Sequence, residues 1–235
     1  MNFSNNSKIN AWITGHSGFI GSELSKLLEK NHELFRISRN DIIELNDLIE
    51  KKINLKNLDK NFLKNLENNY LFHVASKYNP NPKNKKEEEE LVESNINFGL
   101  RIINYFDHEF FNKIITTQSY MELQNENFNN LYVNSKIKFA DKLLYKRNKK
   151  VIMVYIYDTF GLGDKRNKLI TIWLNQLIKN KPVTIYSAKT VINISSNKFV
   201  SKLLTNSTKL NAGKYEIRSE IEMSLIELYE FLKKI

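Results

Sequence analysis

The chain has 235 residues, of which 41% are hydrophobic, so it can bury one good core but not two full domains. It contains no cysteine, which excludes disulfides, thiolate metal ligands and cysteine nucleophiles, and no metal ion is expected. The net charge of +10 comes mostly from scattered lysines, with no basic run interleaved with stacking aromatics. Nucleic acid is therefore not expected as the main partner.

Hydropathy gives no indication of a membrane protein. No stretch of the sequence approaches the length of a membrane span, and residues 1–6 are polar rather than signal-like. These features predict a cytoplasmic protein without a membrane partner.

The first predicted unit is a strand, a glycine turn and a helix. Residues 10–14 form a short apolar run, and apolar residues at helical spacing begin at Phe19. Three of the seven glycines, Gly15, Gly18 and Gly21, fall in the turn between them. Such a turn allows a tight bend, close approach of a pyrophosphate and close packing of the helix, whose N-terminus favours anions. The candidate cofactor-binding residues of this unit are Gly15, Ser17, Gly18, Phe19 and Ile20.

The motif TGHSGFIG, residues 14–21, resembles that of the extended branch of the short-chain dehydrogenase/reductase superfamily. This branch includes nucleotide-sugar epimerases, dehydratases and reductases. The resemblance implies an α/β fold, a Rossmann-type doubly wound parallel sheet with a small C-terminal substrate-binding lobe. We expect an NADP-binding domain with the catalytic Ser, Tyr and Lys in residues 1–156, and an interwoven lobe in residues 157–235.

A second strand is predicted at residues 33–38, and its end indicates the cofactor. An acidic residue there favours NAD, whereas a small residue followed by arginine accommodates the 2′-phosphate of NADP. This chain has Ser38 and Arg39, so NADP is favoured over NAD, although an arginine that only faces solvent remains an alternative.

The next segments are a helix at residues 48–66, a buried strand at residues 70–76 and a solvated loop leading into a helix. Ala75 and Ser76 are small, as expected where the cofactor passes over the strand tip. Apolar residues from Leu91 to Phe106 lie on one helix face, which also carries Asn95. By the resemblance Asn95 supports the active-site lysine through water, and a plain buried or capping asparagine is the alternative.

A strand at residues 113–117 precedes Ser119, and Tyr132 and Lys136 follow on a helix. Residues four apart share a helix face, so the phenol and the ammonium lie together, and a nearby cation lowers the pKa of a tyrosine. Tyr132 is then the predicted acid or base, and Ser119 binds the same substrate oxygen. Thr117 ends the same strand and is the alternative hydroxyl, placed otherwise among the substrate-binding residues.

After a strand at residues 151–156 comes YDTFGLGDKRNKLI, residues 157–170. It resembles the subfamily of CDP-abequose and CDP-paratose synthases, which reduce C4 of a CDP-4-keto-3,6-dideoxyhexose. Asp158 and Lys168 are the substrate-binding candidates from this segment. A helix at residues 172–178, a strand at residues 183–186 and a helix at residues 224–232 complete the lobe. Residues 190–195 lack the arginine that many relatives use for a diphosphate, so Lys189, Lys168 or Arg166 would serve.

Dehydration is disfavoured because Tyr120 and Met121, not an Asp-Glu pair, follow Ser119. The predicted function is NADPH-dependent reduction of the C4 ketone of a nucleotide-activated, CDP-linked deoxysugar for surface polysaccharide. A nucleotide-sugar epimerase with tightly bound NAD and a non-catalytic NADP-binding regulator are the alternatives. The expected partner is the nucleotide sugar, and a homodimer is considered as the assembly.

Overall fold

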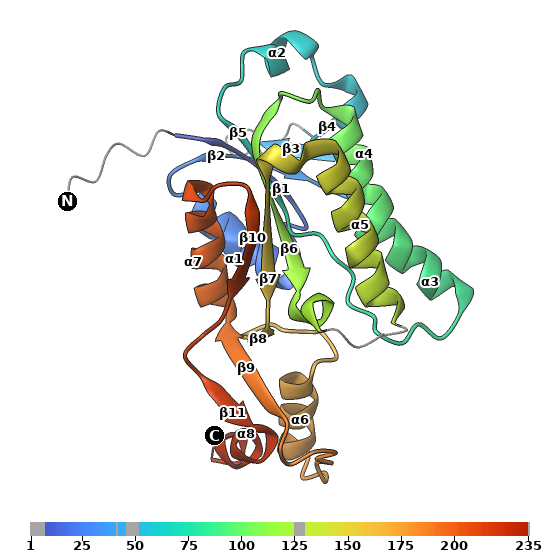
Figure 1. Ribbon diagram of the computed structural model, residues 1–235, viewed down its shortest axis with the longest axis vertical. Helices are drawn as coiled ribbons and strands as arrows, with labels where there is room; N and C mark the ends of the chain where they lie inside the picture. Colours follow the sequence, from blue (N-terminus) through green and yellow to red (C-terminus); the bar gives the residue numbers. More distant parts are fainter. Residues whose placement is uncertain (1–7, 41, 46–51, 125–129, 235) are drawn as a thin grey trace, which may run out of the picture.

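The computed structural model describes residues 8–40, 42–45, 52–124 and 130–234. Its centre is a sheet of eight strands in the order β10-β7-β6-β5-β1-β2-β3-β4 (Figure 1). The first six of these are parallel, namely β10 (Gly213–Ile217), β7 (Val151–Ile156), β6 (Phe111–Ser119), β5 (Asn69–His73), β1 (Asn10–Thr14) and β2 (Glu33–Ile37). At the other edge, β3 (Ile42–Leu45) pairs antiparallel with β2, and β4 (Lys52–Asn54) pairs antiparallel with β3.

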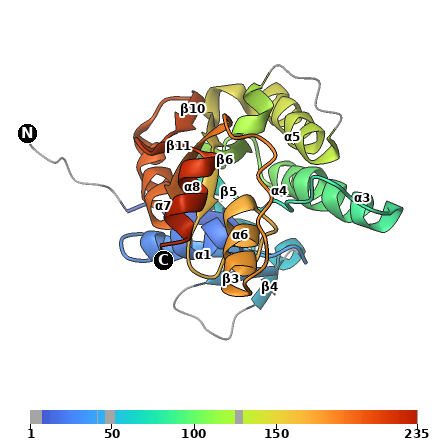
Figure 2. The same cartoon turned by 90° about the horizontal axis from the view of Figure 1, so that it is seen from below.

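Helices cover both faces of this sheet, as a doubly wound fold requires. One face carries α1 (Phe19–Leu28) and α7 (Asn197–Asn206). The other carries α3 (Lys85–Val92), α4 (Phe98–Tyr105) and α5 (Leu131–Arg147). Figure 2, seen from the lobe end, shows these two groups on opposite sides. The prediction of a Rossmann-type sheet is therefore confirmed.

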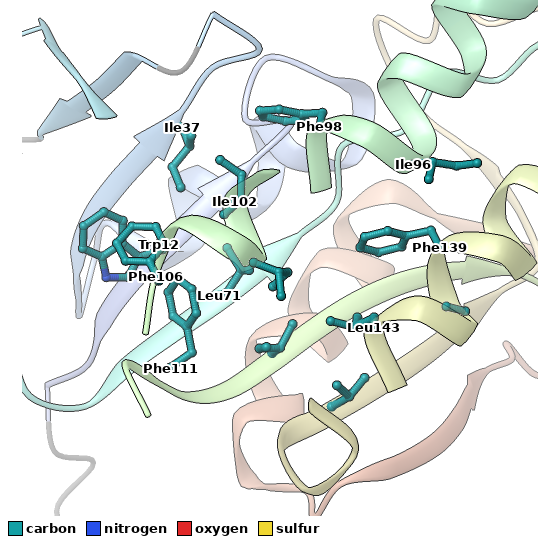
Figure 3. Close-up of a cluster of buried hydrophobic side chains, with 14 of the residues drawn as sticks. Trp12, Ile37, Leu71, Ile96, Phe98, Ile102, Phe106, Phe111, Phe139 and Leu143 are labelled. Carbon is teal, nitrogen blue, oxygen red and sulfur yellow. The ribbon is translucent and has the colours of Figure 1, made fainter. Parts of the chain in front are cut away.

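The strand residues alternate between the two faces. Val151, Met153 and Tyr155 of β7 pack toward α4 and α5, whereas Ile152 and Val154 pack toward α1 and α7. In β1, the Trp12 side chain lies in the core between the sheet and helices α4 and α5 (Figure 3). Its ring stacks on that of Phe35, with the ring centroids 4.2 Å apart. Burial of both strand faces explains why these strands are continuous apolar runs in the sequence.

The C-terminal lobe has its own sheet and core. β8 (Asp158–Phe160), β9 (Val191–Ser196) and β11 (Glu222–Ser224) form a three-stranded sheet in the order β11-β9-β8. Helices α6 (Leu169–Ile178) and α8 (Leu225–Leu232) pack with it around Trp173, Leu228 and Leu232. Between β9 and β11 the chain returns to the large sheet as α7 and β10, so residues 197–217 belong to the Rossmann layer.

Several boundaries differ from the sequence expectation. The predicted strand at residues 183–186 is not a strand: Val183 and Ile185 alternate inward because they pack on the lobe core, and no strand of the described part of the chain pairs with them. The predicted helix at residues 48–66 is wrong in its extent. The described part holds β4, a short 3-10 turn at Leu55–Asn57 and α2 (Lys60–Lys64), which Asp59 caps, and residues 46–51 lie outside the description. β9, α7 and β10 were not predicted from the sequence.

Among the described residues, no helix is long and apolar enough to cross a membrane.

Candidate functional site

A cleft of about 960 Å³ lies along the carboxyl edge of the large sheet. Residues at or directly after the ends of β2, β1, β5, β6 and β7 line it, and these five strands are neighbours in the sheet. In the middle of the cleft, β1 has β2 on one side and β5 on the other, so the strands that follow β1 in the chain are added on both sides of it. Open α/β sheets bind ligands at such a point. Residues of α1, α4 and α5 also line the cleft, as do Thr159, Arg166 and Lys168 of the C-terminal lobe.

The glycine turn after β1 is shaped by close backbone contacts. Gly15 has a φ of +72°, and a Cβ at this position would lie 2.6 Å from the Ala75 Cα. A Cβ on Gly21 would lie 2.0 Å from the Gly15 carbonyl oxygen, so α1 can pack this closely only with glycine there. Helix α1 starts at Phe19, with Gly18 as N-cap and no acidic residue in its first turn. Its N-terminal N–H groups and dipole are therefore available to an anion in the cleft.

All five cofactor candidates of this turn line the cleft: Gly15, Ser17, Gly18, Phe19 and Ile20. So do Ser38 and Arg39 beyond β2, and Ala75 and Ser76 beyond β5. The turn and the β5 end are tied together through Thr14, whose Oγ1 lies 2.8 Å from the His73 Nδ1 and accepts the Ala75 N–H at 3.4 Å. A dinucleotide with its pyrophosphate over the turn fits these residues.

The three catalytic candidates line the same cleft. Tyr132 and Lys136 lie one helical turn apart on α5, both are buried, and Ser119 is the last residue of β6. Hydrogen bonds from Ser76 and Ser119 reach the Tyr132 side chain. A phenol, a hydroxyl and an ammonium therefore converge where a substrate oxygen would enter from the cleft.

The pKa of Tyr132 departs from the sequence expectation. It is raised, first by burial and then by the charge of Glu122, while the bonds from Ser76 and Ser119 only oppose this. Burial also lowers the pKa of Lys136, against the pull of Glu122. The expectation that the pKa of Tyr132 is lowered is thus not met, because burial of the phenol raises it first. Tyr132 is a neutral phenol, which can donate a proton.

Asn95 lies behind the cleft rather than in its lining. It sits in a π-helical turn, Glu93–Asn97, between α3 and α4. Its Oδ1 accepts the Lys77 N–H at 2.7 Å, and its Nδ2 donates to the Lys77 carbonyl at 3.2 Å and to the Ser135 Oγ at 3.0 Å. Through these bonds Asn95, a cofactor-binding candidate of the sequence, holds the loop after Ser76 against α5. The sequence left open whether Asn95 supports the active-site lysine through water or is a plain buried asparagine, and these contacts favour the buried structural role.

The substrate candidates cluster beyond Tyr132. Thr117 and Lys168 line the cleft, whereas Asp158 does not and supports Lys168 from behind, with 3.6 Å between Oδ1 and Nζ. Burial lowers the pKa of Lys168 and Asp158 opposes that shift. Two tyrosines that the sequence reasoning missed extend this cluster. Tyr78 lies edge-on to Tyr132 with centroids 5.1 Å apart and under the Lys168 ammonium, and Tyr157 stacks on Tyr120.

Arg166 was named only as a substitute diphosphate ligand, but it lines the cleft in a fixed position. Its Nη2 donates to the Thr159 Oγ1 at 2.9 Å and to the Asp164 Oδ2 at 2.7 Å, and its guanidinium lies 4.1 Å from the centroid of the Phe19 ring. The Asp-x-Arg spacing was the available signal, because a side chain two residues away can orient a guanidinium. Arg166 thereby brings a fixed positive charge to the first turn of α1.

Glu122 is a further residue that the sequence reasoning missed. Its carboxylate accepts the Ser119 N–H at 2.6 Å, and the Ser119 Oγ accepts the Met121 N–H at 3.3 Å, so the pair caps the short helix Tyr120–Leu123. The Ser-x-x-Glu pattern at residues 119–122 is the known signature of such a capping box and could have revealed it. Within the described residues, no group of His, Asp and Glu side chains is placed to hold a metal ion.

No curated protein sequence matches the chain. Solved structures share its fold. A UDP-N-acetylglucosamine 4-epimerase from Methanobrevibacter ruminantium M1, in complex with UDP-N-acetylmuramic acid, superposes with a TM-score of 0.72 at 18% identity, over 95% of this chain and 80% of that one. WbmF from Bordetella bronchiseptica, in complex with NADH, gives 0.72 at 17% identity, over 97% and 76%. MoeE5, in complex with UDP-glucose and NAD, gives 0.73 at 17% identity, over 96% and 81%.

At these identities the likeness shows the fold alone. The family is shown by sequence, since residues 11–193 match one family over most of the chain, from β1 to the third residue of β9. This protein belongs to the NAD dependent epimerase/dehydratase family.

Proposed function

We propose that the protein reduces the C4 ketone of a nucleotide-activated 6-deoxy or 3,6-dideoxy sugar, with NADPH as reductant, for surface polysaccharide synthesis. The observation that carries this proposal is the joint placement of Ser119, Tyr132 and Lys136 beside a dinucleotide-shaped glycine turn in one cleft. The residues needed for hydride chemistry and those needed for cofactor binding therefore face the same space.

The protonation state of Tyr132 favours reduction. A bound nicotinamide supplies the hydride when a ketone is reduced, and the oxygen of that ketone then needs a proton. Burial holds Tyr132 as a neutral phenol, and Ser119 bonds to it. In the proposed reaction Tyr132 donates its proton to the developing alkoxide, Ser119 stabilises the same oxygen and Lys136 holds the nicotinamide ribose.

The lobe supplies charge for the nucleotide diphosphate. Lys168 lines the cleft with little exposure of its side chain, and Asp158 and the Tyr78 ring orient its ammonium. CDP is proposed as the nucleotide because residues 157–170 resemble the CDP-sugar ketoreductases. Titrating CDP-, UDP-, GDP- and dTDP-sugars into the protein with NADPH present, and following the melting temperature, tests this choice. CDP-sugars should stabilise most, and a stronger effect of UDP-sugars would contradict it.

NADPH is proposed as the reductant because Ser38 and Arg39 line the cleft directly beyond β2. Wild-type protein should bind NADPH at least about tenfold more tightly than NADH, a difference of about 1.4 kcal/mol, and Arg39→Ala should reduce that gap. Lys30→Ala removes an exposed cation from the end of α1 and is the matched control, which should keep the gap. Equal affinities for the two nucleotides in the wild type would refute the NADP assignment.

A second candidate is a nucleotide-sugar epimerase that retains NAD, because WbmF and MoeE5, which share this fold, are described with NADH and with NAD. The absorbance of the purified protein distinguishes the two candidates. An epimerase carries bound nicotinamide through purification, whereas a reductase exchanges it and oxidises added NADPH when a 4-keto sugar nucleotide is supplied. If no keto-sugar nucleotide causes NADPH oxidation although NADPH binds, a non-catalytic NADP-binding regulator is the remaining interpretation.

A further inference from the structure

Behind the catalytic residues lies an acid that the proposed reaction does not use. Glu122 is half-buried and does not line the cleft, yet its carboxylate is bonded to the residue that supplies the catalytic hydroxyl. Besides the Ser119 N–H, the Gln118 side-chain amide donates to both Glu122 oxygens at 3.1 Å when its nitrogen faces them. The carboxylate is thus held on two sides by consecutive residues at the end of β6.

The charge of Glu122 acts on the site itself. It is the charge that opposes the lowering of the Lys136 pKa, and it is the largest charge effect on the pKa of Tyr132. Among the described residues, charged or titratable groups besides Tyr132 face it from neighbouring elements, namely Lys136 and Asp141 on α5, Tyr155 on β7 and Lys214 on β10. Of these, Lys136 is the cation that is buried one helical turn from the catalytic tyrosine.

We propose that Glu122 is a positioning residue, whose carboxylate anchors Ser119 at the end of β6 and supplies the negative charge that faces the buried Lys136. Removing a cation from water is unfavourable unless an opposite charge accompanies it, and Glu122 provides that charge. Its hydrogen bond to the Ser119 N–H anchors the last residue of β6, from which the hydroxyl reaches Tyr132. This inference rests on the proposed function, in which Lys136 holds the cofactor ribose.

The test is the pH dependence of NADPH binding in wild type, Glu122→Gln and Glu227→Gln. The Gln side chain retains an oxygen for the Ser119 N–H but removes the charge, so Lys136 should lose its proton at lower pH. The alkaline limit of NADPH binding should move down by about one pH unit or more, because an opposite charge nearby shifts a pKa by that amount. The alkaline limit of turnover should move in the same direction.

Glu227 is the matched control because it forms the same capping box at the start of α8, with its carboxylate 2.7 Å from the Ser224 N, far along the chain and without any effect on Lys136. Glu227→Gln should lose a similar amount of stability and keep the wild-type pH limits. Coincident pH limits in Glu122→Gln and wild type would overturn the inference. Wild-type protein that binds neither NADPH nor NADH would instead overturn the proposed function, and the inference with it.

If Glu122→Gln does not fold, Glu122→Asp keeps the charge and shortens the side chain by one methylene. The pH limit of NADPH binding should then stay at the wild-type value, while turnover falls about threefold to tenfold, since the Ser119 anchor is displaced. Wild-type turnover in Glu122→Asp would overturn the positioning of Ser119, and a shifted pH limit would overturn the role of the charge.

Discussion

The Rossmann layer and the C-terminal lobe face each other across one cleft, but they hold their binding groups differently. In the Rossmann layer the backbone does the positioning: Gly15, Gly18 and Gly21 set the turn, and strand ends present small residues. In the lobe, charged side chains of β8 and of the loop that follows it do the positioning, with Asp164 orienting Arg166 and Asp158 orienting Lys168. Backbone geometry tolerates few substitutions, whereas side chains on a loop can be exchanged singly. The cofactor end is thus fixed, and the substrate end is where specificity can change.

The largest effect is expected from alanine substitution at one of two glycines of similar φ. Gly15 has a φ of +72° in the Rossmann layer, and Gly163 has a φ of +77° in the lobe. A Cβ on Gly15 would meet the Ala75 backbone at 2.6 Å, whereas a Cβ on Gly163 would meet nothing within 4 Å. Gly15→Ala should therefore lower the free energy of unfolding by about 3 kcal/mol or more and abolish NADPH binding. Gly163→Ala carries only the backbone cost, about 1 kcal/mol.

Urea unfolding measures both glycine variants. Each region contains one of the two tryptophans of the chain, Trp12 in the Rossmann core and Trp173 in the lobe core. Trp12→Phe and Trp173→Phe backgrounds therefore report the two regions separately. Equal losses of unfolding free energy in the two alanine variants would contradict the difference between backbone positioning in the Rossmann layer and side-chain positioning in the lobe.

The next largest effect concerns the proton donor. Tyr132→Phe keeps the ring beside Tyr78 but removes the proton, so turnover should fall about a hundredfold or more while NADPH binding persists. Tyr186→Phe in the lobe is the control, because that side chain is 95% exposed, and it should leave turnover unchanged. Retention of more than about a tenth of the wild-type turnover in Tyr132→Phe would show that another group is the acid.

Acid should destabilise the Rossmann layer before the lobe, because His73 is fully buried there and its pKa is lowered to about 3, first by burial and then by Lys136. The folded state then binds fewer protons than the unfolded state between pH 6.5 and about 3. The stability that neutral His73 contributes is complete above pH 6.5 and is lost as the pH falls, by up to about 1.4 kcal/mol per pH unit. His73→Gln should flatten that slope in urea unfolding, and an unchanged slope would assign it to other groups.

The same contrast explains what the sequence could predict. The strands β1, β2, β5, β6 and β7 and the glycine turn of the Rossmann layer follow from local patterns, because these strands are mostly apolar and largely buried. β10 has no such pattern, since Lys214 and Glu216 are exposed, and it was not predicted. The lobe strand β9 carries Asn193 and serines and pairs with strands far along the chain, so no local pattern marks it. The alternation at residues 183–186 was misleading because packing on a core alone produces it.

The residues of the site also fall into those that the sequence predicts and those that it does not. Ser119, Tyr132 and Lys136 could be identified from residue type and order, and the structure brings them to one cleft. Tyr78 could not, because its place depends on a contact with α5 that spacing does not report. Glu122 and Arg166 had local signals, the Ser-x-x-Glu and Asp-x-Arg spacings, but these spacings do not show what the two side chains meet on other elements. Electrostatics were also out of reach, since the raised pKa of Tyr132 depends on how deeply α5 is buried.

The smallest expected effect lies at the border of the two regions, where Ser119 and Thr117 both line the cleft on β6. They are two residues apart on a regular strand, so their side chains point to the same side of the sheet. The choice between them depends on how far each hydroxyl extends toward Tyr132 and the substrate. Ser119 is nearer the carboxyl tip and bonds to Tyr132. Ser119→Ala should reduce turnover about tenfold or more, because one oxyanion donor contributes a few kcal/mol. It should also cost about 1 kcal/mol of stability, since the Ser119 Oγ caps the turn after β6.

Ser224→Ala, which removes the equivalent cap from α8, separates the two losses, because it should cost similar stability and leave turnover unchanged. Thr117→Val keeps the shape of a buried side chain and removes its hydroxyl, so it should change stability or NADPH affinity more than turnover. Steady-state kinetics on the three variants decide the assignment. If turnover falls in Thr117→Val and persists in Ser119→Ala, Thr117 is the catalytic hydroxyl. Ser119 then acts only as a cap, and the catalytic hydroxyl lies two residues deeper along β6 than the geometry indicates.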